Sequence, residues 1–141
     1  MSAWRRVALE KLPECRELIE KADSIGLLWA YIWFEFENAH SKPKNEDLIS
    51  RFYEYALWCM VESNNADIQT SAFVSFYEHL PVVESVRKDM ANHLTRDDFF
   101  AVKEAFKYFL SEKEYAELQK EFLKESEKRF EAALKKKRGK K

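Results

Sequence analysis

The sequence contains very little glycine, proline or cysteine, with two, three and two residues respectively among 141. Sheet proteins and phosphate-binding loops need glycine at their turns, because glycine adopts backbone conformations that are costly for other residues. The scarcity of glycine therefore argues against an α/β enzyme, a β-sandwich and a loop that cradles phosphate. The two cysteines, Cys15 and Cys59, each lie in a helical apolar pattern, so we expect buried free thiols rather than a disulfide framework.

No apolar run has the length of a membrane-spanning helix. The longest, residues 25–34, has ten residues with Gly26 included, whereas a spanning helix needs about 20. The N-terminus lacks the uninterrupted apolar stretch and the cleavage pattern of a signal peptide. The sequence therefore predicts a cytoplasmic protein that is not integral to a membrane.

The small net charge of −1 hides an uneven distribution of charged residues. The last seven residues, from Lys135 to Lys141, carry six basic groups and no acid. The remaining chain has 18 basic and 25 acidic residues, a net charge of −7. We expect this acidic body to attract cationic partners and to repel nucleic acid. The tail could touch nucleic acid or an anionic lipid surface, but a solvated helix end is the simpler interpretation.

Aromatic residues are abundant and recur at helical spacing, with 11 Phe, 6 Tyr and 4 Trp. Helices are predicted over residues 3–22 with an interruption at Pro13, 24–40, 46–62, 67–80, part of 82–93, 95–110 and 111–134. Ser24, Thr95 and Ser111 are predicted N-caps, the last forming a capping box with Glu114. Because residues 25–34 are apolar on every side, we expect their helix to be covered all round.

The predicted fold class is all-α, a bundle or short α-α superhelix of six to seven antiparallel helices. Residues 1–134 are predicted to form a single helical domain, and residues 135–141 a basic, disordered tail. Several large aromatic side chains should fill the core. They are Trp29, Trp33, Phe52, Phe76, Phe106 and Phe109.

Motifs for catalysis and cofactor binding are missing from the sequence. There is no Walker loop, GxGxxG, HExxH or CxxC pair. Glu37 and His40 form one E-x-x-H pair, whereas a di-iron bundle uses two such pairs and two further glutamates. A histidine near a helix C-terminus explains this pair more simply. We therefore predict no catalytic residue, no metal ligand and no cofactor.

One group of residues is a candidate for binding a partner. If regular helices fold back at Asn65 and at Pro43, then Glu35, Glu54 and Glu78 lie within about one helical turn of the same height. Aromatic residues flank each acid, and such pairs suit a partner rich in Arg or Lys. The alternative is that these glutamates are the solvated edge of aromatic core faces. The predicted partner-binding residues are Glu35, Tyr53, Glu54, Tyr77, Glu78 and His79.

Four segments, residues 28–37, 51–56, 73–81 and 108–112, resemble a family of small all-helical bacterial cytoplasmic proteins. The likeness covers most of residues 12–123. Members of that family are similar in size to the immunity proteins of bacterial toxin systems. The resemblance implies a bacterial cytoplasmic protein with a binding role, and it supplies no catalytic residues.

Three functions are consistent with these patterns. The first is a non-enzymatic protein-binding module, such as an immunity-type protein that masks a basic partner surface. The second is a helical scaffold or adaptor with a helix-binding groove. The third is a metal or enzyme bundle built on carboxylates and a histidine. Its residues would be Glu35, Glu37, His40, Glu54 and Glu78. We favour the first; the partner's identity and the oligomeric state stay open.

Overall fold

The computed structural model describes residues 1–139, and every regular element in that range is helical. The predicted all-α class is therefore confirmed. Where the sequence predicts one domain over residues 1–134, the contacts divide the chain into two compact units. The first unit is Met1–His79, and the second begins at Leu80. Each unit has its own core.

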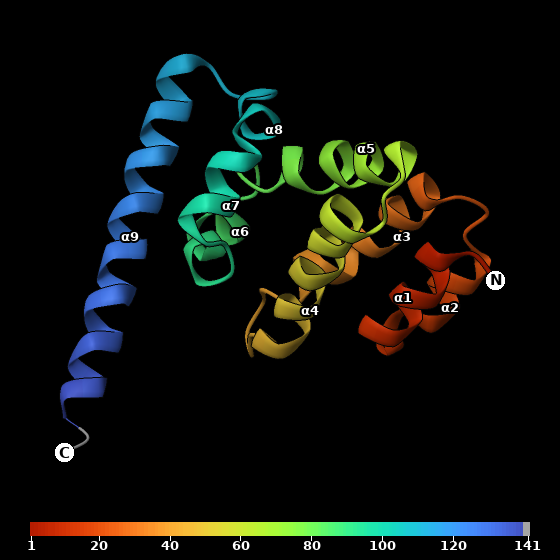
Figure 1. The fold of residues 1–141 in the computed structure, drawn as a ribbon, viewed down its shortest axis with the longest axis horizontal. Helices are drawn as coiled ribbons and strands as arrows, with labels where there is room; N and C mark the ends of the chain where they lie inside the picture. Colours follow the sequence, from red (N-terminus) through yellow and green to blue (C-terminus); the bar gives the residue numbers. More distant parts are fainter. Residues whose placement is uncertain (140–141) are drawn as a thin grey trace. The chain divides into compact units, whose positions relative to one another are not determined.

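The first unit contains helices α1 to α5 (Figure 1). Their bounds are α1 (Ala3–Lys11), α2 (Arg16–Lys21), α3 (Ile25–Asn38), α4 (Glu46–Leu57) and α5 (Ala66–Ser75). Short 3-10 turns at Pro13–Cys15 and Tyr77–His79 and a π-helical turn at Trp58–Glu62 complete the unit. Pro13 separates α1 from α2, as predicted, because proline cannot donate the backbone hydrogen bond that would continue α1.

Polar side chains fix where the helices of the first unit begin. The Ser24 hydroxyl accepts a hydrogen bond from the backbone N–H of Leu27, which confirms the predicted N-cap of α3. Asn45 and Asn65 do the same for α4 and α5 through their side-chain oxygens. Each cap satisfies donors that a helix N-terminus otherwise leaves unpaired.

Aromatic rings from α3, from α4 and from Phe76, the residue after α5, make the core of the first unit. Phe36 is fully buried, and its ring centroid lies 5.2 Å from that of Phe52 and 5.0 Å from that of Phe76. Trp29 lies 5.4 Å from Tyr55, whose hydroxyl donates to the backbone oxygen of Trp4. Tilted and edge-on contacts of this kind add to the stability that burial alone provides.

The second unit contains helices α6 to α9 (Figure 1). Their bounds are α6 (Glu84–Asp89), α7 (Arg96–Ala101), α8 (Lys103–Lys107) and α9 (Glu112–Arg138), with a 3-10 turn at Met90–Asn92 after α6. The ring of Phe99 stacks on that of Phe122 with centroids 4.1 Å apart, which holds α7 against α9. Thr95 caps α7 and the Ser111–Glu114 capping box opens α9, both as predicted.

The described residues contain nine α-helices rather than six to seven. One reason is Val102, whose φ of −111° and ψ of 20° interrupt the predicted 95–110 helix. The burial of Phe109 was predicted from that continuous helix and is wrong. Because α8 ends at Lys107, Phe109 follows the helix in a bend and is 50% exposed. Trp33 is half-buried, whereas Trp29, Phe52, Phe76 and Phe106 are buried as predicted.

Helix α3 is not covered on every side, which corrects the prediction for residues 24–40. Leu27 is 41% exposed and Phe34 is 71% exposed, although Ile25, Leu28, Trp29, Ile32 and Phe36 are buried. An apolar composition all round a helix predicts complete cover only when neighbouring helices reach every side. In the first unit, α2, α4 and α5 contact α3 without enclosing it.

Helix α9 continues through Arg138, so residues 135–138 are helical where the sequence predicts a disordered tail. Residues 140 and 141 of that predicted tail lie outside the described residues. Of the helix's 27 residues, Leu118 and Phe122 near its N-terminal end are the buried ones. Among the described residues, no helix has the length and apolar character needed to cross a membrane.

Candidate functional site

The six residues predicted to bind a partner do not share one exposed surface. Glu35 and Glu54 are exposed, and His79 is half-buried. Tyr53 and Tyr77 are 5% and 2% exposed, so both rings belong to the core. Of the six predicted residues, Glu35 and Glu54 have the solvent exposure that contact with a partner requires.

Glu78 is 6% exposed, so the expectation that it offers an exposed charge is wrong. The prediction assumed regular helix as far as Leu80, but α5 ends at Ser75 and Glu78 lies in the 3-10 turn that follows. This tighter turn changes the direction of its side chain. Burial raises the pKa of the Glu78 carboxyl, and the nearby His79 partly offsets that rise. Replacing Glu78 with Lys would bury a cation, so this residue cannot report on a surface.

Glu54 borders a different group of exposed side chains. It lies at the end of α4, and the next turn of the chain presents Leu57 and Val61, 42% and 69% exposed. A hollow of about 290 Å³ is lined by these three residues with Trp58, Glu62 and Lys11. We call Glu54, Leu57, Trp58, Val61 and Glu62 the acidic–apolar strip. It places three apolar side chains between two exposed carboxylates.

A π-helical turn gives the strip its shape. The N–H of Ser63 donates to the carbonyl of Trp58 at 3.0 Å, a bond that spans five residues and widens the turn. The Ser63 hydroxyl donates to the Cys59 carbonyl, and the Gln69 side chain donates to the Met60 carbonyl. These bonds fix the wide turn, and Trp58 stacks on Tyr55 with ring planes 8° apart. Single π-helical turns occur often at functional sites.

The strip lies in the more acidic part of the chain. The first unit has eight lysines and arginines against 13 aspartates and glutamates, a formal charge of −5. At the strip itself, Lys11 Nζ lies 3.2 Å from Glu54 Oε2. Because both side chains of this ion pair are about half exposed, 40% and 54%, the pair contributes little to stability. A cation from another molecule can therefore compete with Lys11 for Glu54.

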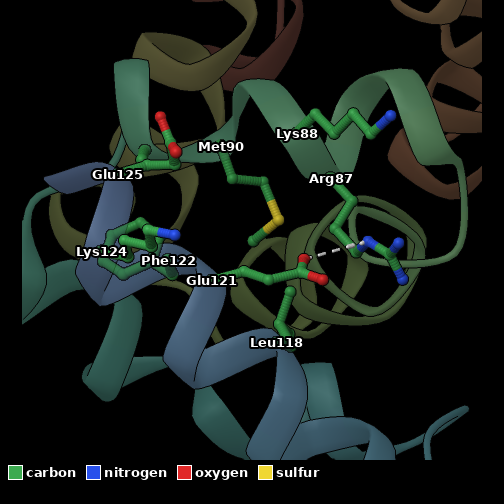
Figure 2. A pocket seen from close by; sticks show the side chains of 9 residues that line it. Arg87, Lys88, Met90, Leu118, Glu121, Phe122, Lys124 and Glu125 are labelled. Atoms are coloured by element: carbon green, nitrogen blue, oxygen red, sulfur yellow. Dashed lines mark ion pairs between the residues drawn. The ribbon is translucent and has the colours of Figure 1, made fainter. Parts of the chain in front are cut away.

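The second unit has a larger hollow of about 440 Å³ between α6 and α9 (Figure 2). Its floor is made by Met90, Leu118 and Phe122, each no more than 3% exposed. Arg87 and Glu121 face each other across it, with Nε and Oε2 3.5 Å apart. Two further cations and one further acid complete the rim. The volume suits a small ligand, but a rim of mixed charge favours neither anions nor cations.

A buried pair in the second unit was not found from the sequence. The carboxylate of Asp89, 4% exposed, lies 2.8 Å from His93 Nε2 and accepts a hydrogen bond from the Asn92 side chain. The available signal was an acid four residues before the histidine, whereas the E-x-x-H pattern places the acid three residues before it. The pair links the end of α6 to the turn after it, and such buried hydrogen bonds stabilise a fold.

The sequence predicts no metal ligand and no catalytic nucleophile, and the residues nearest to those chemistries are His40, Cys15 and Cys59. His40 Nδ1 lies 2.8 Å from the carbonyl oxygen of Phe36, so the imidazole contacts the backbone at the C-terminal end of α3. Both cysteines are buried free thiols, as predicted. Burial raises the pKa of Cys15 to about 11 and that of Cys59 to about 12. At neutral pH both are therefore protonated and weakly nucleophilic.

Four residues of the strip, namely Leu57, Trp58, Val61 and Glu62, were absent from the predicted site. Their sequence pattern reads as a regular amphipathic helix with Cys59 on the buried side, and no residue signals the π turn. Comparison with known proteins adds no assignment: no family model, curated protein or solved structure matches the chain significantly.

Proposed function

We propose that this protein is a non-enzymatic protein-binding module that holds a basic, amphipathic helix of a partner on the acidic–apolar strip. One observation carries the proposal: Leu57, Trp58 and Val61 are bracketed by the exposed carboxylates of Glu54 and Glu62 around a side-chain-sized hollow. Exposed apolar groups beside charged ones are the arrangement that recognises an amphipathic helix.

The apolar part of the strip lies around the hollow. Leu57 ends α4 and Val61 lies in the π-helical turn that follows, and both line the hollow with Trp58. A partner helix that presents two apolar residues one turn apart can contact both. The hollow of about 290 Å³ is slightly smaller than the usual range for small-molecule sites, about 300–1,000 Å³. Its size therefore favours insertion of one large side chain of a protein partner.

The two carboxylates select the charge of the partner. Cations flanking the apolar residues of a partner helix would pair with Glu54 and Glu62, while the first unit's net charge of −5 would speed their approach. An immunity-type protein that masks a basic toxin surface would use this same recognition. The metal or enzyme bundle receives less support, because Glu35 and Glu54 are exposed whereas Glu78 is buried.

The test is an NMR titration of the ¹⁵N-labelled full chain with two synthetic helical peptides. Both peptides carry leucines at i and i+4, and one has lysines where the other has glutamates. We expect the basic peptide to shift the amide signals of residues 54–62 and the acidic peptide to leave them unchanged. Glu54→Lys with Glu62→Lys should weaken binding of the basic peptide by at least about tenfold, because each lost pair becomes a repulsion.

Two further variants make the result specific. Glu17→Lys with Glu20→Lys changes the charge of the same unit equally at exposed residues of α2, so binding should stay within about twofold of wild type. Lys11→Gln removes the cation that competes for Glu54, so binding should become tighter. Equal binding by wild type and Glu54→Lys/Glu62→Lys, or signal shifts confined to other residues, would exclude the strip as the site.

A further inference from the structure

We infer that the partner helix is the exposed C-terminal part of α9 in a second copy of this chain, so that copies associate head to tail. The inference rests on the proposed function and names the occupant of the strip. Residues 127–138, which we call the α9 end, are exposed throughout. Figure 1 shows this part of α9 continuing beyond the other helices of its own unit.

The α9 end carries two exposed apolar residues one helical turn apart. Phe130 is 65% exposed and Leu134 is 38% exposed, and they lie four residues apart on one side of the helix. Leu57 and Val61 of the strip border one hollow, so a helix that lies along it can bring both pairs into contact. Phe130 also has the size to enter the hollow beside Trp58.

The charges of the α9 end are complementary to those of the strip. Residues 135–138 are all basic and follow Leu134 directly in the last turn of α9. Glu54 and Glu62 lie on either side of the apolar residues of the strip. The complementarity extends to the units, since the second has 16 lysines and arginines against 12 aspartates and glutamates, a formal charge of +4 against −5 for the first. Such a distribution attracts unlike units of two copies.

The two surfaces differ, so the contact is heterologous and each copy can use both its strip and its α9 end. Heterologous contacts produce chains or closed rings rather than a twofold dimer. Each surface has few apolar residues, and interfaces that bury less than about 1,200 Å² are usually weak. We therefore expect association that depends on protein concentration and weakens as salt rises.

Sedimentation velocity on the full chain tests the inference through an exchange of charges. The wild type should show a mass that rises with concentration. Glu54→Lys/Glu62→Lys and Lys135→Glu/Lys136→Glu should each associate at least about tenfold more weakly. A chain that carries all four changes should recover association to within about threefold of wild type, because the exchanged charges are again complementary.

Two controls distinguish an effect of the changed charges on association from damage to the fold. Circular dichroism must show wild-type helix content for each variant, and Glu17→Lys/Glu20→Lys must associate like wild type. Phe130→Gln with Leu134→Gln leaves the strip intact and changes exposed residues, so it should abolish association without unfolding the chain.

A wild type that stays monomeric at millimolar concentration and low salt would overturn the inference, and so would failure of the fourfold variant to recover. Neither result concerns the peptide titration, so the proposed function would stand with another basic helix as the partner. Association that survives Glu54→Lys/Glu62→Lys would also overturn the inference, because copies would then meet elsewhere.

Discussion

The two units of this chain, Met1–His79 and Leu80–Lys141, use their residues in different ways. In Met1–His79, three helices direct aromatic rings inward, and Phe36 alone contacts the rings of Trp33, Phe52, Tyr53 and Phe76. In the unit that begins at Leu80, four short segments cover one end of α9, whose later residues are exposed. The first unit places its largest residues in a core, whereas much of the second unit belongs to the exposed part of α9.

The difference shows where each unit can offer a binding surface. The strip of the first unit is fixed by the π turn and by packing of α4 and α5 around it. The α9 end of the second unit has no buried residue, and its contacts with the rest of that unit include a hydrogen bond from the Arg129 guanidinium to the carbonyl of Ala91. A rigid receptor surface and a projecting helix are complementary roles, which is the physical basis for the association proposed above.

The largest expected effect is on the ring core of the first unit. Phe76→Ala should lower the free energy of unfolding by about 3–5 kcal/mol, because it leaves a cavity among Trp29, Phe36 and Tyr53. Urea denaturation followed by circular dichroism measures the change. Phe109→Ala in the second unit is the matched control, and its half-exposed ring should cost less than about 1 kcal/mol. Similar losses of unfolding free energy for both variants would mean that a large ring contributes equally to stability in the two units.

An intermediate effect on stability is expected at Arg51, which connects the end of α1 and the Pro13–Cys15 turn to α4. Its guanidinium donates to the carboxylates of Glu14 and Asp47 and to the carbonyl of Lys11. Its side chain is 22% exposed, so solvent screens these bonds only in part. Arg51→Gln should cost about 1–2 kcal/mol at pH 7. Arg16→Gln, which breaks an exposed pair with Glu20, should cost less than about 0.5 kcal/mol.

The cost of Arg51→Gln should depend on pH. The hydrogen bond from Arg51 lowers the pKa of the Glu14 carboxyl in the folded chain. A group with a depressed pKa stabilises the fold above its ordinary pKa, and the stabilisation is lost as pH falls through the lowered value. The difference in stability between wild type and Arg51→Gln should therefore be largest above about pH 5 and shrink towards pH 2. A constant difference across this range would contradict the assignment of the pKa shift to Arg51.

Local signals predicted much of the fold. The caps at Ser24, Thr95 and Ser111 appear as predicted, since each depends on a side chain and a backbone N–H three residues away. Buried aromatic residues such as Phe52 in α4 and Phe76 directly after α5 were also identified from spacing. Phe109 was misplaced because one residue, Val102, leaves helical geometry, and no proline or glycine marks the interruption.

The candidate site was harder to predict because it depends on where helices stop being regular. Glu54 was identified, but its proposed relation to Glu78 assumed α-helical rise on both sides of Asn65. A π turn before Asn65 and a 3-10 turn after Phe76 both break that assumption. The π turn is accompanied by a contact between separate segments, the bond from Gln69 to the Met60 carbonyl, which spacing along the sequence does not reveal.

The smallest expected effect on stability is that of shortening the α9 end, in contrast to the large effect expected for Phe76→Ala. Deleting residues 135–141 removes six of the chain's 24 basic residues but no buried side chain among those described. The four described basic residues lie in the last turn of α9, where cations interact favourably with the helix dipole. That interaction is worth only a few tenths of a kcal/mol at an exposed helix end, and shortening the helix removes residues that fray readily. We therefore expect the free energy of unfolding to change by less than about 0.5 kcal/mol in urea denaturation.

The control is deletion of residues 118–141, which removes Leu118 and Phe122 from the core of the second unit and should abolish its cooperative unfolding. A loss above about 2 kcal/mol in the shorter deletion would mean that the basic residues contact the rest of the chain. They would then not be free to bind a second copy.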